Sequence, residues 1–154
     1  MIQRIQTIYL AIASALAGML LNGNIVTLVG NDGGSYALNF KGITDLSNGI
    51  SSLVEKSLPL TLLIIVVPVL FFISIFLFKN RKLQIRLTVL TTLLNAGTLI
   101  LIIYYIIYAG NKLNASLVFN VKITFPLIGL ILGYLAFRAI LKDELLIKSL
   151  DRIR

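Results

Sequence analysis

The polar side chains that could bind a substrate inside an apolar helix form one regular row of hydroxyl and amide groups. They follow spacings of three, four and seven within the apolar segment 85–108: Thr88, Thr91 or Thr92, Asn95 and Thr98. This spacing places them on one face of a helix. The face could line a path for an uncharged substrate, or it could hydrogen-bond to a neighbouring helix. We favour helix packing, because an amide that faced lipid would lack a hydrogen-bond partner.

Residue types typical of catalytic and metal sites are scarce. The chain has no histidine and no cysteine, which excludes disulfides, imidazole or thiolate metal ligands and the commonest general base. Its six acidic residues are scattered, and the adjacent pair Asp143 and Glu144 points apart on a helix. No charged residue lies centrally in an apolar run, which argues against an ion pump. We therefore expect no catalytic residue, no metal site and no cofactor, and we do not expect an enzyme.

The composition is that of a membrane protein. Of 154 residues, 58% are hydrophobic and 13% are charged, against about 45 to 50% and 25% in soluble domains. The mean hydropathy is +0.96. The length allows a single domain, 1–154, because four spans of about 20 residues use more than half of it. The net charge of +8 collects at the ends of apolar runs, so we expect no nucleic-acid partner.

Four apolar runs predict an all-α membrane protein, an antiparallel bundle of four transmembrane helices. The predicted spans are 5–21, 58–78, 85–108 and 125–141. The basic turn 79–86 separates the second span from the third, because each of its four charges would cost about 2.5 to 3.5 kcal/mol at a bilayer centre. So short a connection joins antiparallel neighbours. The last helix continues as an amphipathic cytoplasmic tail, 142–154.

The first run is rich in small residues. It has the shape of a secretory signal, with an early positive charge before an apolar stretch, but we expect it to be retained as the first helix. Two pairs of small residues lie four positions apart, Ala11 with Ala15 and Ser14 with Gly18. They either let a neighbouring helix approach closely or reflect composition alone, and both interpretations stay open.

Proline and glycine give two further packing predictions. Pro68 lies in the middle of the second span and should kink it, as a hinge or, as we favour, as a matter of shape. In the fourth span, Gly129 and Gly133 form a GxxxG motif. Two glycines four apart make a groove for close helix contact, either within the bundle or between protomers, and we expect contact within the chain.

The polar connections 22–57 and 109–124 predict a small β cap on the outer side. Residues 25–29 and 35–40 are rich in β-branched and aromatic types and flank a glycine-rich turn, which indicates a hairpin. A lone hairpin is marginal in water, and the alternating residues 115–123 offer a third strand. We therefore expect a three-stranded cap.

The stretch 47–56 leads from this hairpin into the second span. We expect it to form a short interfacial turn of helix.

The distribution of lysine and arginine predicts the orientation. Ten of these residues fall at the termini and the basic turn, and four fall in the two outer connections. The positive-inside rule then places both termini in the cytoplasm. The cations expected to contact a partner or anionic lipid are Lys79, Arg81, Lys82, Arg86 and Arg152.

Three stretches carry a resemblance to a known family. They are MIQRIQTIYL at 1–10, FKNRKLQIR at 78–86, and the tail that begins LKDEL at 141–145 and ends DRIR at 151–154. With them the whole chain resembles a family of small four-helix inner-membrane proteins of Bacteroidota, known as a domain of unknown function. The resemblance implies a location in the bacterial inner membrane, and it brings no activity and no site residues.

Together these features predict a non-catalytic accessory or assembly subunit of a larger inner-membrane complex. Its partners would be membrane lipids and other inner-membrane proteins, with a homo-oligomer left open. The alternative is a small homo-oligomeric channel or carrier for an uncharged or lipidic substrate. Adhesion through the β cap is a third class, which rests on topology alone.

Overall fold

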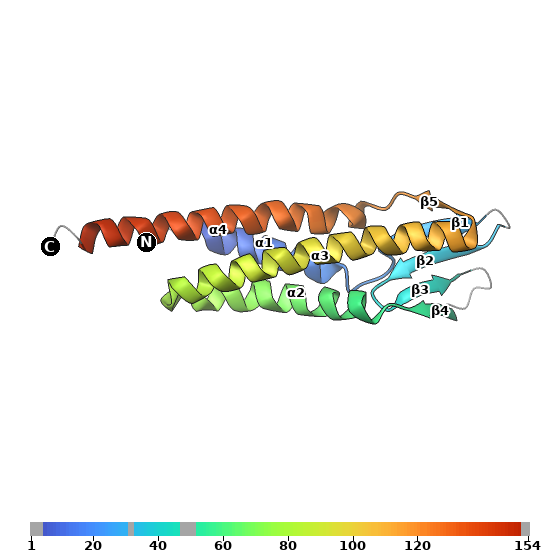
Figure 1. The fold of residues 1–154 in the computed structure, drawn as a ribbon, viewed down its shortest axis with the longest axis horizontal. Coiled ribbons are helices and arrows are strands. Elements are labelled where there is room, and N and C mark those ends of the chain that lie inside the picture. The colour runs from blue at the N-terminus through green and yellow to red at the C-terminus, as the bar shows by residue number, and fades with distance from the viewer. Residues whose placement is uncertain (1–4, 31–32, 47–51, 152–154) are drawn as a thin grey trace.

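The computed structural model describes residues 5–30, 33–46 and 52–151, and within them the chain is mostly helical (Figure 1). These residues form four α-helices: α1 (Ile5–Met19), α2 (Leu58–Phe76), α3 (Arg81–Leu113) and α4 (Thr124–Asp151). Short 3-10 helices follow α2 and precede α4, namely η1 (Leu77–Lys79) and η2 (Val121–Ile123). Five strands complete the described chain: β1 (Val26–Gly30), β2 (Ser35–Asn39), β3 (Gly42–Asp45), β4 (Ser52–Lys56) and β5 (Ala115–Val118).

The helices pack side by side as a bundle, with the sheet beyond one end (Figure 1). Helix α1 packs against α2 and α4, and α3 packs against the same two helices. Helices α1 and α3 are therefore diagonal neighbours across the bundle. The start of α1, the α2–α3 connection and the end of α4 lie away from the sheet, and α4 projects past the other helices there (Figure 1).

Within the described residues, three helices are long and apolar enough to cross a membrane: 58–79, 81–113 and 121–146. Helix α1 is also apolar, but its 15 residues extend only about 22 Å at 1.5 Å per residue. It ends at Met19, two residues before the expected end of the first span, and residues 1–4 lie outside the described chain. All four helices leave large apolar side chains exposed, for example Leu62, Leu93 and Ile131 at 55 to 65%.

The connection between α2 and α3 corrects the predicted basic turn. Only Asn80 separates η1 from α3, so Arg81, Lys82 and Arg86 belong to the first turns of the helix. The carbonyl of Asn80 accepts from the N–H groups of residues 83 and 84, which starts the helix there. Charged residues at a membrane boundary can remain helical, so the end of an apolar run is not the end of a helix.

Helix α3 also continues five residues past the expected end at Tyr108. It ends where Asn114 adopts a left-handed conformation, with φ of 44°, and donates its N–H to the carbonyl of Gly110. The 33 residues of α3 extend about 50 Å, and its last turns lie against β1 and β5. The predicted continuation of the last helix beyond residue 141 is confirmed, since α4 runs unbroken to Asp151.

The sheet is larger than the three strands expected. Its order is β4-β3-β2-β1-β5, and every neighbouring pair is antiparallel. The predicted hairpin is confirmed as β1 and β2, with Leu28 opposite Tyr36. The predicted third strand is present as β5, where Leu117 pairs with Leu28 from the other side. It is shorter than expected, because η2 takes up residues 121–123.

Strands β3 and β4 were not expected, and the helical prediction for 47–56 is wrong over Ser52–Lys56. Residues 47–51 lie outside the described chain. The β2–β3 turn is made by Asn39, whose side-chain oxygen accepts from the N–H groups of Lys41 and Gly42. Gly42 has φ of 138° and lies against the carbonyl of Glu55, so only glycine fits. Pairing with β3 decides the conformation of β4, since strand formation depends on context.

A buried cluster ties the sheet to the helices. Its members come from the end of α1, from the sheet, and from α2 and α3: Leu20, Ile25, Val26, Leu28, Leu38, Ile43, Leu60, Ile64, Ile102 and Ala109. A second cluster lies within the bundle and joins α1, α2 and α4: Leu10, Ala13, Ala17, Val67, Phe71 and Ala136. Helix α2 passes through Pro68, which is buried, as one continuous helix.

Candidate functional site

The predicted polar row of α3 faces the interior of the bundle. Thr88, Thr91, Asn95 and Thr98 are at most 1% exposed. Thr92, the alternative to Thr91, is only partly buried. The row is one residue longer than expected, because Gln84 is buried on the same face. Its spacing of four before Thr88 could have revealed it in the sequence.

Most of these side chains are used in hydrogen bonds that hold the helices. The hydroxyls of Thr91, Thr92 and Thr98 donate to carbonyls one turn earlier in α3, at 2.7 to 3.1 Å. The Asn95 amide donates across to the carbonyl of Pro126 in α4 at 2.9 Å, the kind of interhelical bond expected for it. The Gln84 amide likewise donates to the carbonyl of Ser74 in α2 at 3.0 Å. The row therefore joins α3 to both of its neighbours.

The two glycines of the GxxxG motif in α4 lie against the polar row of α3. A Cβ atom on Gly129 would lie 2.8 Å from Nδ2 of Asn95. A Cβ atom on Gly133 would meet the Thr92 hydroxyl. Both glycines are buried. The GxxxG motif thus forms a groove for α3 of the same chain.

The small residues of α1 lie on different sides of the helix. Ala11 and Ala15 are exposed. Ala13 and Ala17 are buried instead, because the inward face of α1 follows a different helical phase. The Ser14 hydroxyl donates to the carbonyl of Pro68 in α2 at 3.0 Å. A Cβ atom on Gly18 would meet nothing within 4 Å.

Among the described residues, three buried polar atoms at the end of the bundle away from the sheet have no hydrogen-bond partner. They are Oε1 of Gln6 in α1, and Oε1 of Gln84 and Oγ1 of Thr88 in α3. Each belongs to a side chain that is at most 2% exposed. Neutral acceptors of this kind can bind water. Gln6 was not expected as a buried residue.

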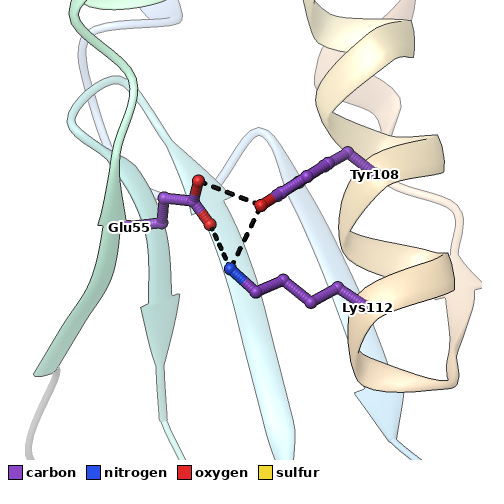
Figure 2. A network of polar contacts seen from close by, with 3 residues as sticks. All are labelled: Glu55, Tyr108 and Lys112. Carbon is purple, nitrogen blue, oxygen red and sulfur yellow. Dashed lines mark hydrogen bonds and ion pairs between the residues drawn. The ribbon is translucent and has the colours of Figure 1, made fainter.

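A second polar group connects the sheet to the far end of α3 (Figure 2). Lys112 Nζ lies 2.8 Å from Oε2 of Glu55 in β4, and the Tyr108 hydroxyl donates to Oε1 of Glu55 at 3.2 Å. Lys112 Nζ also donates to the Tyr108 oxygen at 3.1 Å. The hydrogen bond from Lys112 is the largest effect on the Glu55 carboxyl and lowers its pKa. Desolvation is the next largest effect and opposes it, and the hydrogen bond from Tyr108 then lowers the pKa further.

Sequence reasoning missed this network, although Tyr108 and Lys112 are one helical turn apart. It expected Glu55 in the short helical turn 47–56, and it ended the third span at Tyr108, before Lys112. The pairing became visible only once β4 was placed beside α3.

The basic residues of the α2–α3 connection lie at the opposite end of the bundle (Figure 1). Lys79, Lys82 and Arg86 are exposed, and Arg81 is half-buried. Arg152 lies outside the described residues. Over the described part of the chain, no three histidine, cysteine, aspartate or glutamate side chains gather where they could hold a metal ion.

Comparison with known proteins supplies the family. The family model "Domain of unknown function (DUF4293)" matches residues 2–153. The chain belongs to the DUF4293 family. This confirms the resemblance to a family of unknown function over nearly the whole chain. Searches of curated proteins and of solved structures found no match.

The contact between Asn95 and Gly129 predicts that alanine substitutions at two glycines of this DUF4293 protein differ in their effect on stability. Gly129→Ala should displace the Asn95 amide and lower the free energy of unfolding by about 1 to 3 kcal/mol. Gly97→Ala is the control, because its Cβ atom would lie an ordinary 3.7 Å from Leu63. It should leave stability unchanged or raise it by up to about 1 kcal/mol through helix propensity. Unfolding in detergent micelles measures both, and a loss of equal size in both variants would contradict the contact.

The Glu55 network predicts a pH-dependent contribution to stability. Because the folded-state pKa of Glu55 is lowered, its contribution is complete above the unfolded pKa of about 4.3 and is lost as the pH falls through the folded value. Glu55→Gln should therefore lower the melting temperature at neutral pH, and the two curves should converge in acid. Lys112→Met should reduce the pH dependence in the same way. The exposed Lys56 lies beside Glu55 on β4 and serves as the control. Lys56→Met should leave the pH dependence of the melting temperature unchanged. An equal effect of both lysine variants would argue against the network.

Proposed function

We propose that this DUF4293 protein is a non-catalytic integral membrane protein that serves as an accessory or assembly subunit of a larger complex in the bacterial inner membrane. The observation that carries the proposal is the use of the polar interior. The Asn95 and Gln84 amides and three threonine hydroxyls bond to backbone carbonyls of α2, α3 and α4. These groups stabilise the bundle, and they are unavailable for chemistry on a substrate.

In this proposal the four helices cross the membrane as an antiparallel bundle. The exposed faces of α2, α3 and α4 are apolar over lengths that suit a hydrocarbon core of about 30 Å. Helix α1 would be the shortest crossing, and its outward face is apolar at Ile5, Ile8, Ile12 and Met19. Such faces on all sides would be an aggregation hazard in water, whereas lipid accepts them.

The basic end of the bundle would face the cytoplasm, and the sheet would lie on the other side. Lysine and arginine predominate at the start of α3, and residues 138–154 carry five of them against three acidic residues, as the positive-inside rule favours for cytoplasmic segments. The sheet, together with the Glu55 network, would then be extracytoplasmic.

Two surfaces outside the apolar bundle suit partner proteins. One is the basic end, at Lys79, Arg81, Lys82 and Arg86. The other is the β5 edge of the sheet with the residues after it, where Leu117, Val118, Phe119 and Val121 are exposed. An exposed sheet edge pairs readily with a strand of another protein, so an accessory role has a docking surface on each side of the membrane.

A small homo-oligomeric channel or carrier for an uncharged or lipidic substrate is the second candidate. It is favoured by the buried acceptors of Gln84 and Thr88, which lie inside the bundle and have no hydrogen-bond partner in the part of the chain that the structure describes. In such a protein Thr88→Val should reduce flux through reconstituted vesicles while the fold is retained. In an accessory subunit the same variant should change stability alone.

The orientation is tested by labelling a chain that naturally contains no cysteine. Asn80 and Ser52 are exposed at opposite ends of the molecule. In intact cells a membrane-impermeant maleimide should label Ser52→Cys, once it has access to the outer face of the inner membrane. Asn80→Cys should be labelled only after that membrane is opened. The reverse pattern would invert the topology, and labelling of both sites in closed cells would contradict a membrane-spanning bundle.

The accessory role is tested by extracting native membranes in mild detergent, separating complexes by size and identifying the components by mass spectrometry. We expect the chain to migrate with a larger complex at fixed stoichiometry. Reversing the charges of Arg81, Lys82 and Arg86, or changing Val118→Glu at the sheet edge, should release it from that complex if the altered surface makes the contact. Migration as a monomer or homo-oligomer would contradict the accessory role and favour the second candidate.

A further inference from the structure

A groove between α1 and α4 lies at the end of the bundle away from the sheet. Its volume is about 600 Å³, and most of its lining is apolar. From α1 it receives Ile5 and Tyr9, and from α4 it receives Leu135 and Leu145. At this end of the bundle α4 projects past the start of α1 (Figure 1). The groove is thus a mostly apolar surface formed by α1 and α4.

Two cations also line this groove. Arg138 and Lys142 are four residues apart on α4, so they lie on the same helix face one turn apart. Both side chains are exposed. The Arg138 guanidinium also lies 6.0 Å from the centre of the ring of Tyr134, which is not among the described residues that line this groove. Among the described residues that form the groove, none is acidic.

The position of Arg138 and Lys142 along α4 indicates their depth in a membrane. Residues 124–137 carry no charge, and Arg138 is the first charged side chain after them. In the membrane arrangement proposed above, this boundary lies at the level of the lipid headgroups, with Leu135 on the hydrocarbon side. An arginine and a lysine at this depth can reach a phosphate while the apolar lining contacts a chain that enters the bilayer.

A second groove of this bundle serves as a comparison. It lies between α3 and α4, has a volume of about 260 Å³, and includes Val89, Leu93, Gly133 and Phe137. It contains no charged residue, so any acyl chain would suit it equally well. The α1–α4 groove differs because apolar and cationic groups adjoin in one site.

We propose that the α1–α4 groove binds one anionic phospholipid, with its phosphate at Arg138 and Lys142 and an acyl chain along Ile5, Tyr9 and Leu135. The inference rests on the membrane embedding proposed above and not on the accessory role. Charge complementarity selects an anionic headgroup, and the adjoining apolar surface distinguishes a lipid from free phosphate.

Native mass spectrometry of the purified full-length protein tests the site, with phosphatidylglycerol as the probe and phosphatidylcholine as the neutral control lipid. Arg138→Gln with Lys142→Gln should weaken phosphatidylglycerol binding by about 25-fold, the effect of two cations near an anionic headgroup. Lys41→Gln with Lys56→Gln removes the same charge from two exposed lysines at the sheet end of the molecule and should leave binding nearly unchanged. Free inorganic phosphate should not compete with the lipid.

A variant that keeps every charge separates the groove from general electrostatics. Ala139 lines the groove and is partly buried, so Ala139→Phe should fill it and also reduce phosphatidylglycerol binding. Arg138→Lys with Lys142→Arg should retain binding, and circular dichroism and thermal unfolding report whether each variant folds. Equal losses from the two glutamine pairs, equal binding of both lipids by the unmodified protein, or a change in dimer population in place of lipid binding would overturn the proposal. Because the assay uses the isolated protein, it is independent of whether a partner complex exists.

Discussion

The packing of this protein depends on how one amide is satisfied inside an apolar bundle. Asn95 is almost completely buried and donates to the carbonyl of Pro126. An unsatisfied polar group in hydrocarbon costs several kcal/mol, so α3 and α4 must approach closely enough for this bond. Gly129 permits that approach because it has no side chain to displace the amide. The close packing of α3 against α4 therefore depends on this hydrogen bond and on the absence of a side chain at Gly129.

The sheet depends on a different interaction. It sits beyond the helix ends, where it is held by a buried cluster that joins Ile25, Leu38 and Ile43 to Leu60 and Ile102. Burial of such side chains stabilises a structure by about 1.5 to 3 kcal/mol each when water is the alternative. The Glu55 network adds a directional contact between β4 and α3 (Figure 2). Because α3 extends past its apolar part to meet the sheet, helices and sheet form one connected structure.

The different uses of polar groups inside the bundle and at the surface guide the functional proposals. The interior of the bundle uses most of its polar side chains for packing, and the described residues contain no metal-binding cluster. The chemistry that remains is at the surface: cations at one end, exposed sheet edges at the other, and a groove where both apolar and cationic groups are available. These are features of a protein that contacts lipids and other proteins, which is why we propose an accessory role.

The sequence by itself determined the apolar helices, the hairpin of β1 and β2, the continuation of α4 and the inward direction of the polar row from Thr88 to Thr98. Each of these depends on local composition and on the helical or strand period, which neighbouring residues alone define. Only the tertiary structure decided that Ala13 and Ala17 pack in place of Ala11 and Ala15, because that depends on which face of α1 meets α2 and α4. Strands β3 and β4 likewise form because β3 pairs with both β2 and β4. The contact of Glu55 with Lys112 and the α1–α4 groove join residues that are distant in the chain, and no local pattern specifies such pairs.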